Sequence, residues 1–320
     1  MGLMPTVEAL GYDHFGLVRS PAVRRAACVL ALLLAACEHA KTPSGTNSVA
    51  PDSIVAAESS AAPVAPRWLG ALGPALFVPS DSAGQAFAIL SDTLASIDDL
   101  SDTIGVRLFG RNGAAQPARL AQVKPSDSTE CPSWRVVSPA SAAPWSAGFA
   151  GDAVTVLPLD SLNAMSHADS SRLATALIRL ASVLHEDASD AGDSRFVGLP
   201  FSVRTAWSFA LADGHQVVVA TLQRQINQEA SPLEEHTLLI AERDARPGAA
   251  DDSWTTTYSE RSRGDEETIQ TRELLAAVKL GSQPPLLVLS RDYGDRVDYS
   301  LLERVAGGWR VRWSGSGQSC

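Results

Sequence analysis

Residues able to perform acid–base or metal chemistry lie closest together at Glu234-Glu235-His236. Neighbouring carboxylates and an imidazole are the groups that general acid–base catalysis and zinc binding require. The trio follows a Ser-Pro pair and leads into an alternating strand pattern, so we interpret it as an exposed turn. Together with Glu229, these residues are the candidates for a hydrolase whose catalytic residues are dispersed along the chain.

The other histidines show no spacing that binds a metal. His167, His185 and His215 stand outside any H-E-x-x-H or H-x-x-E-H array. The acidic run at 186–193 contains several carboxylates, but their spacing is not that of an EF-hand loop. We therefore interpret this run as a solvated loop, and we predict no catalytic residue, no metal ligand and no cofactor.

An export signal lies between Arg24 and Cys37. Arginines precede an uncharged run at 26–36, which is too short to span a bilayer and typical of the apolar core of a signal peptide. The run ends in Leu34-Ala35-Ala36-Cys37, which resembles the lipobox of bacterial lipoproteins. This resemblance implies that residues 1–36 are removed and that Cys37 is lipidated. The alternative is an ordinary secretory signal, with Cys37 a plain thiol.

The residues around this signal indicate how the mature chain is held. Glu8 and Asp13 precede the arginines, whereas a signal peptide normally begins with its basic residues, so we expect translation to start later. Segment 37–66 is rich in Ala, Ser, Thr and Pro after its cysteine, and we interpret it as a flexible tether. The expected partner is a membrane, reached through the lipid anchor. Glu38 favours the outer membrane facing the periplasm, by resemblance to enterobacterial lipoprotein sorting.

The remaining cysteines fit an exported chain. Once Cys28 leaves with the signal peptide and Cys37 takes the lipid, Cys131 and Cys320 are the only thiols left. An oxidising compartment favours a disulfide between them, which would close a loop of roughly 190 residues and stabilise the fold by on the order of 4 to 5 kcal/mol through loop-closure entropy. Two free thiols or an intermolecular disulfide are the alternatives.

The charge balance argues against nucleic acid as a partner. The chain carries 26 Lys and Arg against 36 Asp and Glu, for a formal net charge of −10. A phosphate-binding surface requires a positive field, and the basic residues form no cluster in the sequence. A protein or a small molecule remains as the possible partner.

Alternating apolar residues and turn signals predict a mainly β (α+β) fold built from antiparallel meanders. Segment 67–165 is a β-rich half with a hairpin turn at Asn112-Gly113. Segment 196–320 is a β meander, and segment 166–195 holds a helix and the acidic loop. One domain or two remain possible for a chain of this length.

The clearest helix spans about 169–185. Asp169 and Ser170 suit an N-cap, and the following leucines lie on one face at helical spacing, so the helix should pack against the body. The run Leu274–Leu280 fits either a helix or a buried strand, because it is too short to decide between them.

A final hairpin is predicted at the end of the chain. Val297, Tyr299 and Leu301 alternate with polar residues, as do Trp309, Val311 and Trp313. The Gly307-Gly308 pair between them should form a two-residue turn that fixes the register.

Residues 272–320 resemble the terminal repeat of secreted bacterial proteins with integrin-type FG-GAP β-repeats. The resemblance rests on Leu275–Leu280, Pro285–Leu289, Tyr299–Val305 and Gly307-Gly308-Trp309. In that family an acidic loop between the first two strands binds calcium, whereas this chain has Gly281-Ser282-Gln283-Pro284 there. The resemblance therefore implies β architecture without the metal.

Three functional classes fit these observations. The leading interpretation is a lipid-anchored envelope protein whose β-rich body is a non-catalytic binding or assembly module. The alternatives are an envelope hydrolase with dispersed catalytic residues and a structural spacer lipoprotein. A deep pocket with convergent carboxylates or histidines would favour the hydrolase.

Replacing the lipobox cysteine tests the anchor. In cells that produce the protein, Cys37→Ser should block processing or move the protein from the membrane fraction to the soluble fraction, because the acceptor of the lipid is lost. Quantitative fractionation followed by intact-mass measurement gives the readout. A wild-type chain that is soluble and begins beyond residue 37 would contradict the anchor.

Overall fold

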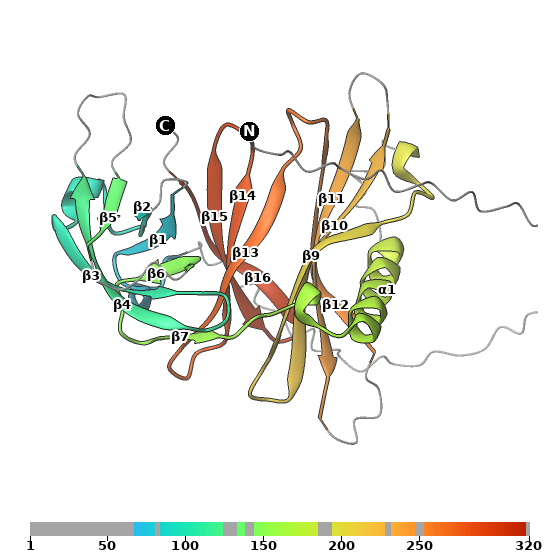
Figure 1. Ribbon diagram of the computed structural model, residues 1–320, viewed down its shortest axis with the longest axis horizontal. Helices are drawn as coiled ribbons and strands as arrows, with labels where there is room; N and C mark the ends of the chain where they lie inside the picture. Colours follow the sequence, from blue (N-terminus) through green and yellow to red (C-terminus); the bar gives the residue numbers. More distant parts are fainter. Residues whose placement is uncertain are drawn as a thin grey trace, which may run out of the picture. The chain divides into compact units, whose positions relative to one another are not determined.

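The protein is mainly β, as the sequence predicts, with antiparallel sheets and one α-helix among the described residues. A computed structural model describes residues 67–80, 84–123, 133–137, 144–184, 194–227, 232–246 and 253–317. Three sheets account for all the described strands (Figure 1). Short 3₁₀ turns add η1 (Gly70–Leu72), η2 (Ile97–Asp99), η3 (Leu162–Ala164) and η4 (Ser194–Phe196).

The first sheet closes into a small barrel in the order β1-β2-β5-β4-β3-β6. Apolar residues alternate along its strands, and the barrel is filled by Phe77, Leu108, Leu120 and Trp134. The Phe77 and Trp134 rings meet edge-on with centroids 5.5 Å apart, an arrangement that aromatic rings prefer. Its strands are β1 (Ala75–Pro79), β2 (Gln85–Leu90), β3 (Thr103–Phe109), β4 (Ala115–Val123), β5 (Ser133–Val136) and β6 (Ala147–Phe149).

Two five-stranded antiparallel sheets form the rest of the fold. The strand order is β12-β11-β10-β9-β8 in one, called sheet C, and β16-β15-β14-β13-β7 in the other, called sheet B. Sheet C contains β8 (Asp160–Ser161), β9 (Ser202–Ala210), β10 (His215–Ile226), β11 (Leu233–Asp244) and β12 (Thr255–Gly264). Sheet B contains β7 (Val154–Leu157), β13 (Thr271–Leu280), β14 (Leu286–Asp292), β15 (Val297–Val305) and β16 (Gly308–Ser316).

Sheets B and C pack face to face as a sandwich. Their shared core contains Val217, Val219 and Ile240 from sheet C and Leu287 and Leu302 from sheet B. The other face of sheet B packs against the barrel through a second core. Sheet B is therefore buried on both faces, which explains why β13 and β14 are apolar along most of their length.

The barrel is attached to sheet B by paired tryptophans. The rings of Trp68 and Trp313 meet edge-on with centroids 4.7 Å apart. Asp92 accepts a hydrogen bond from the Trp313 indole at 2.5 Å and another from the backbone N–H of Trp68 at 2.7 Å. One carboxylate thus joins the start of the described chain, the barrel and the last strand.

Helix α1 (His167–Val183) covers the face of sheet C that points away from sheet B. Leu173, Leu177 and Ala181 are its buried residues, which confirms the predicted packing face. The helix begins two residues earlier than predicted, because the cap is Ser166, whose hydroxyl accepts from the backbone N–H of Asp169. Asp169 instead lies in the first turn, where a carboxylate favours the positive end of the helix.

The run Leu274–Leu280 is a strand, which resolves the ambiguity left by its length. An irregularity in its pairing between Leu274 and Ala276 changes the face on which its side chains lie. Leu274 therefore faces sheet C, while Leu275 and Ala276 both face the barrel. A residue pattern interrupted by a bulge matches neither a regular strand nor a helix.

The last hairpin exists, but its predicted register is wrong in two respects. The two-residue turn is Ala306-Gly307, since Val305 pairs with Gly308. Gly308 is required by a close approach, because a Cβ there would lie 2.4 Å from the carbonyl oxygen of Thr257. A register shift between Leu301 and Leu302 then places Trp309 and Trp313 on different faces of the sheet.

Trp309 and Trp313 lie on opposite faces of sheet B. Trp309 belongs to the sandwich core, and Trp313 belongs to the core shared with the barrel. Strict alternation would place both on one face, so the bulge is the feature that lets one strand contribute a tryptophan to each core.

Candidate functional site

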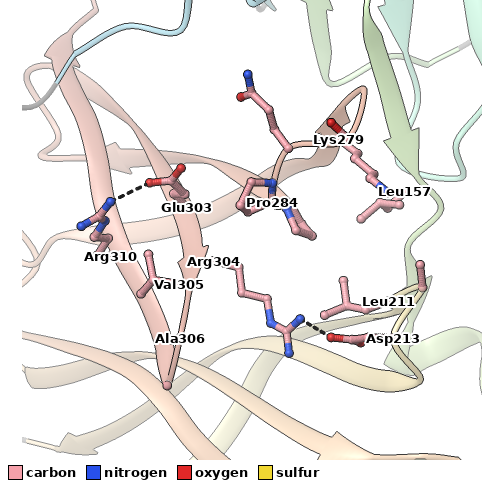
Figure 2. A pocket seen from close by; sticks show the side chains of 15 residues that line it. Leu157, Leu211, Asp213, Lys279, Pro284, Glu303, Arg304, Val305, Ala306 and Arg310 are labelled. Carbon is pink, nitrogen blue, oxygen red and sulfur yellow. Dashed lines mark hydrogen bonds and ion pairs between the residues drawn. The ribbon is translucent and has the colours of Figure 1, made fainter.

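Hairpin turns from both sheets of the sandwich enclose a pocket of about 820 Å³, called the turn pocket here (Figure 2). Sheet C supplies the turn between β9 and β10, and sheet B supplies the turns between β13 and β14 and between β15 and β16. The end of β7 completes the wall. Turns of rigid antiparallel sheets hold their side chains at fixed positions, so the pocket is largely preformed.

Apolar residues form much of the lining of the turn pocket. Leu211 is buried at its base, and Leu157, Val305 and the Pro284-Pro285 pair surround it. Five charged residues also line the pocket: Asp213, Lys279, Glu303, Arg304 and Arg310. The combination of an apolar surface with a few polar groups is the usual composition of a ligand site.

Arg304 joins the two sheets across the base of the pocket. From β15 it donates to both oxygens of Glu242 on β11, with Nε–Oε1 at 3.2 Å and Nη2–Oε2 at 2.8 Å. Its Nη1 donates to Asp213 Oδ2 at 2.5 Å, the contact dashed in Figure 2. The indole N–H of Trp309 donates to Glu242 Oε1 at 2.8 Å. Two carboxylates of sheet C thus bind one guanidinium of sheet B.

The pKa of Asp213 reflects this arrangement. Partial burial opposes ionisation, but the hydrogen bonds from Arg304 and from the backbone N–H of His215 outweigh it and lower the pKa of Asp213 to about 2. The same carboxylates raise the pKa of Arg304 above its usual value. Both groups are therefore fully charged near neutral pH.

A second ion pair lies across the pocket. Arg310 donates to Glu303 at 3.1 Å, and Arg312 approaches the same oxygen at 3.8 Å. Figure 2 shows Lys279 beside Leu157, with no dashed line to it. Within the described part of the chain, its ammonium group has no hydrogen bond or ion pair.

The trio Glu234-Glu235-His236 lies inside strand β11, so the interpretation as an exposed turn is wrong. Glu235 is fully buried and His236 is 1% exposed. Successive strand residues point to opposite faces, so Glu235 points to the face that α1 covers, and Glu234 and His236 point to the other. The three groups do not converge on a common point and form no acid–base site.

Glu235 is held by two arginines. Arg224 donates to its two oxygens at 2.8 and 3.0 Å, and Nε of Arg263 donates at 2.6 Å. The rings of Phe201 and Phe196 lie against the Arg224 guanidinium, at 4.6 and 5.7 Å from ring centroid to Cζ. Burial opposes the charge on Glu235, yet both arginines favour it, and its pKa is lowered. A carboxylate fixed in this way is structural.

His236 is neutral in this fold. Burial lowers its pKa, although Glu234, whose carboxylate lies 2.7 Å from Nε2, opposes the shift. Arg204 and Arg272 are positive neighbours that lower the pKa further. Nε2 lies 2.7 Å from Glu234 Oε2 and 3.1 Å from Arg204 Nη1, and in the Nε2–H tautomer it donates to the carboxylate, so Nη1 cannot donate to the same nitrogen. A second proton on Nδ1 would have no acceptor among the described residues.

The remaining predicted residues lie outside the described residues: Cys37, Cys131, Cys320, Glu229 and the acidic run at 186–193. Among the residues that are described, no group of three or more His, Cys, Asp or Glu side chains could hold a metal ion. Sequence reasoning missed every charged residue of the turn pocket. The available signal was the charged residues next to predicted hairpin turns, but a sequence does not show which turns meet.

Comparison with known proteins gives no relative for this fold. No protein-family model, curated protein or solved structure matches the chain. In the parts of the chain that the structure describes, no helix has the length and apolar character needed to cross a membrane.

Removing Arg304 should destabilise the sandwich much more than removing Arg310. Arg304→Met leaves Glu242, with its side chain 9% exposed, without its charged partner and should cost roughly 3 kcal/mol. Arg310→Met removes a cation that is 62% exposed and should cost under about 1 kcal/mol. Urea denaturation followed by tryptophan fluorescence measures both. Equal losses of unfolding free energy in the two variants would show that Arg304 does not hold the two sheets together.

The stability of the protein should fall as the pH drops below about 6.5 because of His236. Unfolding releases the imidazole to its ordinary pKa, so the unfolded state takes up a proton that the folded state does not bind. This lowers the free energy of unfolding by at most about 1.4 kcal/mol per pH unit. His236→Gln should have a shallower dependence between pH 7.5 and 5.5 in urea titrations. A steeper dependence in the variant would contradict a neutral, buried imidazole.

Proposed function

We propose that this chain is a lipid-anchored envelope protein whose folded body is a non-catalytic binding module, and that its ligand occupies the turn pocket. The observation that carries this proposal is the pocket itself, built from turns of both sheets of the sandwich. Its volume of about 820 Å³ lies within the range of small-molecule sites, roughly 300 to 1,000 Å³.

Preorganisation supports binding at this place. Asp213, Arg304 and Glu242 connect the two sheets at the base of the pocket, so the walls are fixed before a ligand arrives. A site that is already ordered loses little conformational entropy on binding. The apolar lining supplies affinity, and the charged residues that line the pocket supply selectivity.

The state of the charged groups supports a non-catalytic role. Asp213 and Glu303 are each bound to an arginine, and Glu235 and His236 are buried on opposite faces of sheet C. General acid–base catalysis needs a carboxylate or imidazole that can reach a substrate proton. Among the described residues, the candidates of the dispersed hydrolase do not meet in one pocket.

The anchor rests on the sequence alone. The lipobox motif before Cys37 supports the anchor, and the Ala, Ser, Thr and Pro composition of 37–66 supports the tether; both lie outside the described residues. A coil of about 29 residues would let the body reach some tens of ångströms from the bilayer. This reach suits a module that captures a ligand away from the membrane surface.

Photo-cross-linking in producing cells tests the binding proposal. A photoreactive phenylalanine analogue placed at Pro284, in the pocket wall, should form an adduct of defined mass with the resident ligand. The same residue at Val183, which is 65% exposed on α1, is the control and should form none. Mass spectrometry of the purified chains gives the readout. No adduct at Pro284, or equal adducts at both positions, would contradict binding in the turn pocket.

A further inference from the structure

Lys279 occupies an unusual position on an interior strand. It lies on β13, between β14 and β7, where most neighbouring residues are buried. It is two residues from Ala277, which faces the sandwich core, so the alternation of the strand points Lys279 the same way. A charge on the core-facing side of a central strand is unfavourable unless water or a partner compensates it. The turn pocket is where this group reaches solvent.

The other charges at the pocket compensate one another, because the three carboxylates of Asp213, Glu242 and Glu303 face the three guanidinium groups of Arg304, Arg310 and Arg312. Arg304 is bound by Asp213 and Glu242, and Arg310 is bound by Glu303. The guanidinium of Arg304 already uses its Nε, Nη1 and Nη2 for carboxylates. Lys279 therefore contributes a positive charge that no described residue of the pocket balances. The chain as a whole is acidic, with a formal net charge of −10.

We propose that the turn pocket binds a monovalent carboxylate with an apolar body, and that Lys279 is the partner of the carboxylate group. This inference rests on the proposed function and names the class of ligand. Leu157, Leu211 and Pro284 take the apolar body, and the ammonium group beside Leu157 takes the acid (Figure 2). A cationic ligand is disfavoured because it would face Lys279 directly.

The charge of the pocket sets the charge of the ligand. One uncompensated ammonium group balances one negative charge, whereas a phosphate monoester carries up to about two at neutral pH. A dianion would also have to displace Asp213 or Glu303 from an arginine to gain a second cation. A neutral analogue would leave the lysine without a partner in a partly apolar site, as the apo protein does.

Lysine labelling gives a direct assay, because the chain has three lysines, Lys41, Lys124 and Lys279. The full chain in detergent is acetylated with and without 4-phenylbutanoate, and each lysine is quantified by mass spectrometry. The carboxylate should protect Lys279 at least about threefold while Lys41 and Lys124 react as before. Equal protection of all three would mean that the probe consumes the reagent, and it would overturn the inference.

Matched probes test the preference for a carboxylate separately from the existence of a binding site. 4-Phenylbutan-1-ol keeps the apolar body without charge, and 4-phenylbutyl phosphate carries a second charge. Both should bind at least about tenfold more weakly than the carboxylate in calorimetric titrations. Protection of Lys279 by the alcohol with equal affinity would overturn the carboxylate preference and leave the binding module in place. If 4-phenylbutanoate does not protect Lys279 from acetylation, the inference is overturned. The cross-linking experiment at Pro284 tests the proposed function independently.

Variants at position 279 complete the test. Lys279→Met keeps the apolar stem and should weaken binding of 4-phenylbutanoate about tenfold, while binding of the alcohol stays unchanged. Lys279→Arg should keep binding within about threefold. Arg172→Met is the matched control, because it removes one positive charge from α1, where the side chain is 79% exposed. Equal affinity of the carboxylate for wild type and Lys279→Met would overturn the assignment of Lys279.

Discussion

Burial of sheet B on both faces is the constraint on which the rest of the fold depends. One face packs on sheet C, and the other packs on the barrel, so the apolar side chains of β13 and β14 contribute to two separate cores. An antiparallel sheet usually leaves one face to water and shows strict alternation. In this sheet β13 and β14 instead have continuous apolar runs, and bulges direct neighbouring side chains of β13 and β16 to the correct core. Trp309 and Trp313 are the clearest case, because a single register shift gives each core its own tryptophan.

Two buried carboxylates of this body are surrounded by several hydrogen-bond donors each. Glu235 with Arg224 and Arg263, and Glu242 with Arg304 and Trp309, each satisfy a buried carboxylate with several donors. Such groups add little stability relative to apolar residues of the same shape, but removing one member is costly. Their benefit is specificity, because each set fixes how its strands lie against one another, and the Glu242 set joins strands whose paired residues are 62 positions apart. The set around Arg304 fixes the relative position of sheets B and C where the turn pocket opens.

Local sequence patterns were sufficient to predict most strands, and insufficient to predict how they pair. The runs at 75–79, 85–90, 154–157 and 286–289 are strands as expected, because their apolar residues and flanking turn signals act over a few positions. The pairing of β7 with β13 and of β8 with β9 depends on contacts across the sandwich, which no local pattern encodes. Glu235 shows the same limit for the site. Its partners Arg224 and Arg263 lie 11 and 28 residues away, so an acidic pair before a histidine looked like an exposed turn.

The loop Gly281-Ser282-Gln283-Pro284 has no charged side chain, although it lies beside the charged residues of the turn pocket. None of its four residues has a carboxylate, so a hard cation would find no charged ligand in it. Ser282, Gln283 and Pro284 line the turn pocket. They lie next to apolar proline and leucine side chains and to the ammonium group of Lys279. A loop without carboxylates beside an ammonium group suits the proposed anion with an apolar body better than it suits a cation.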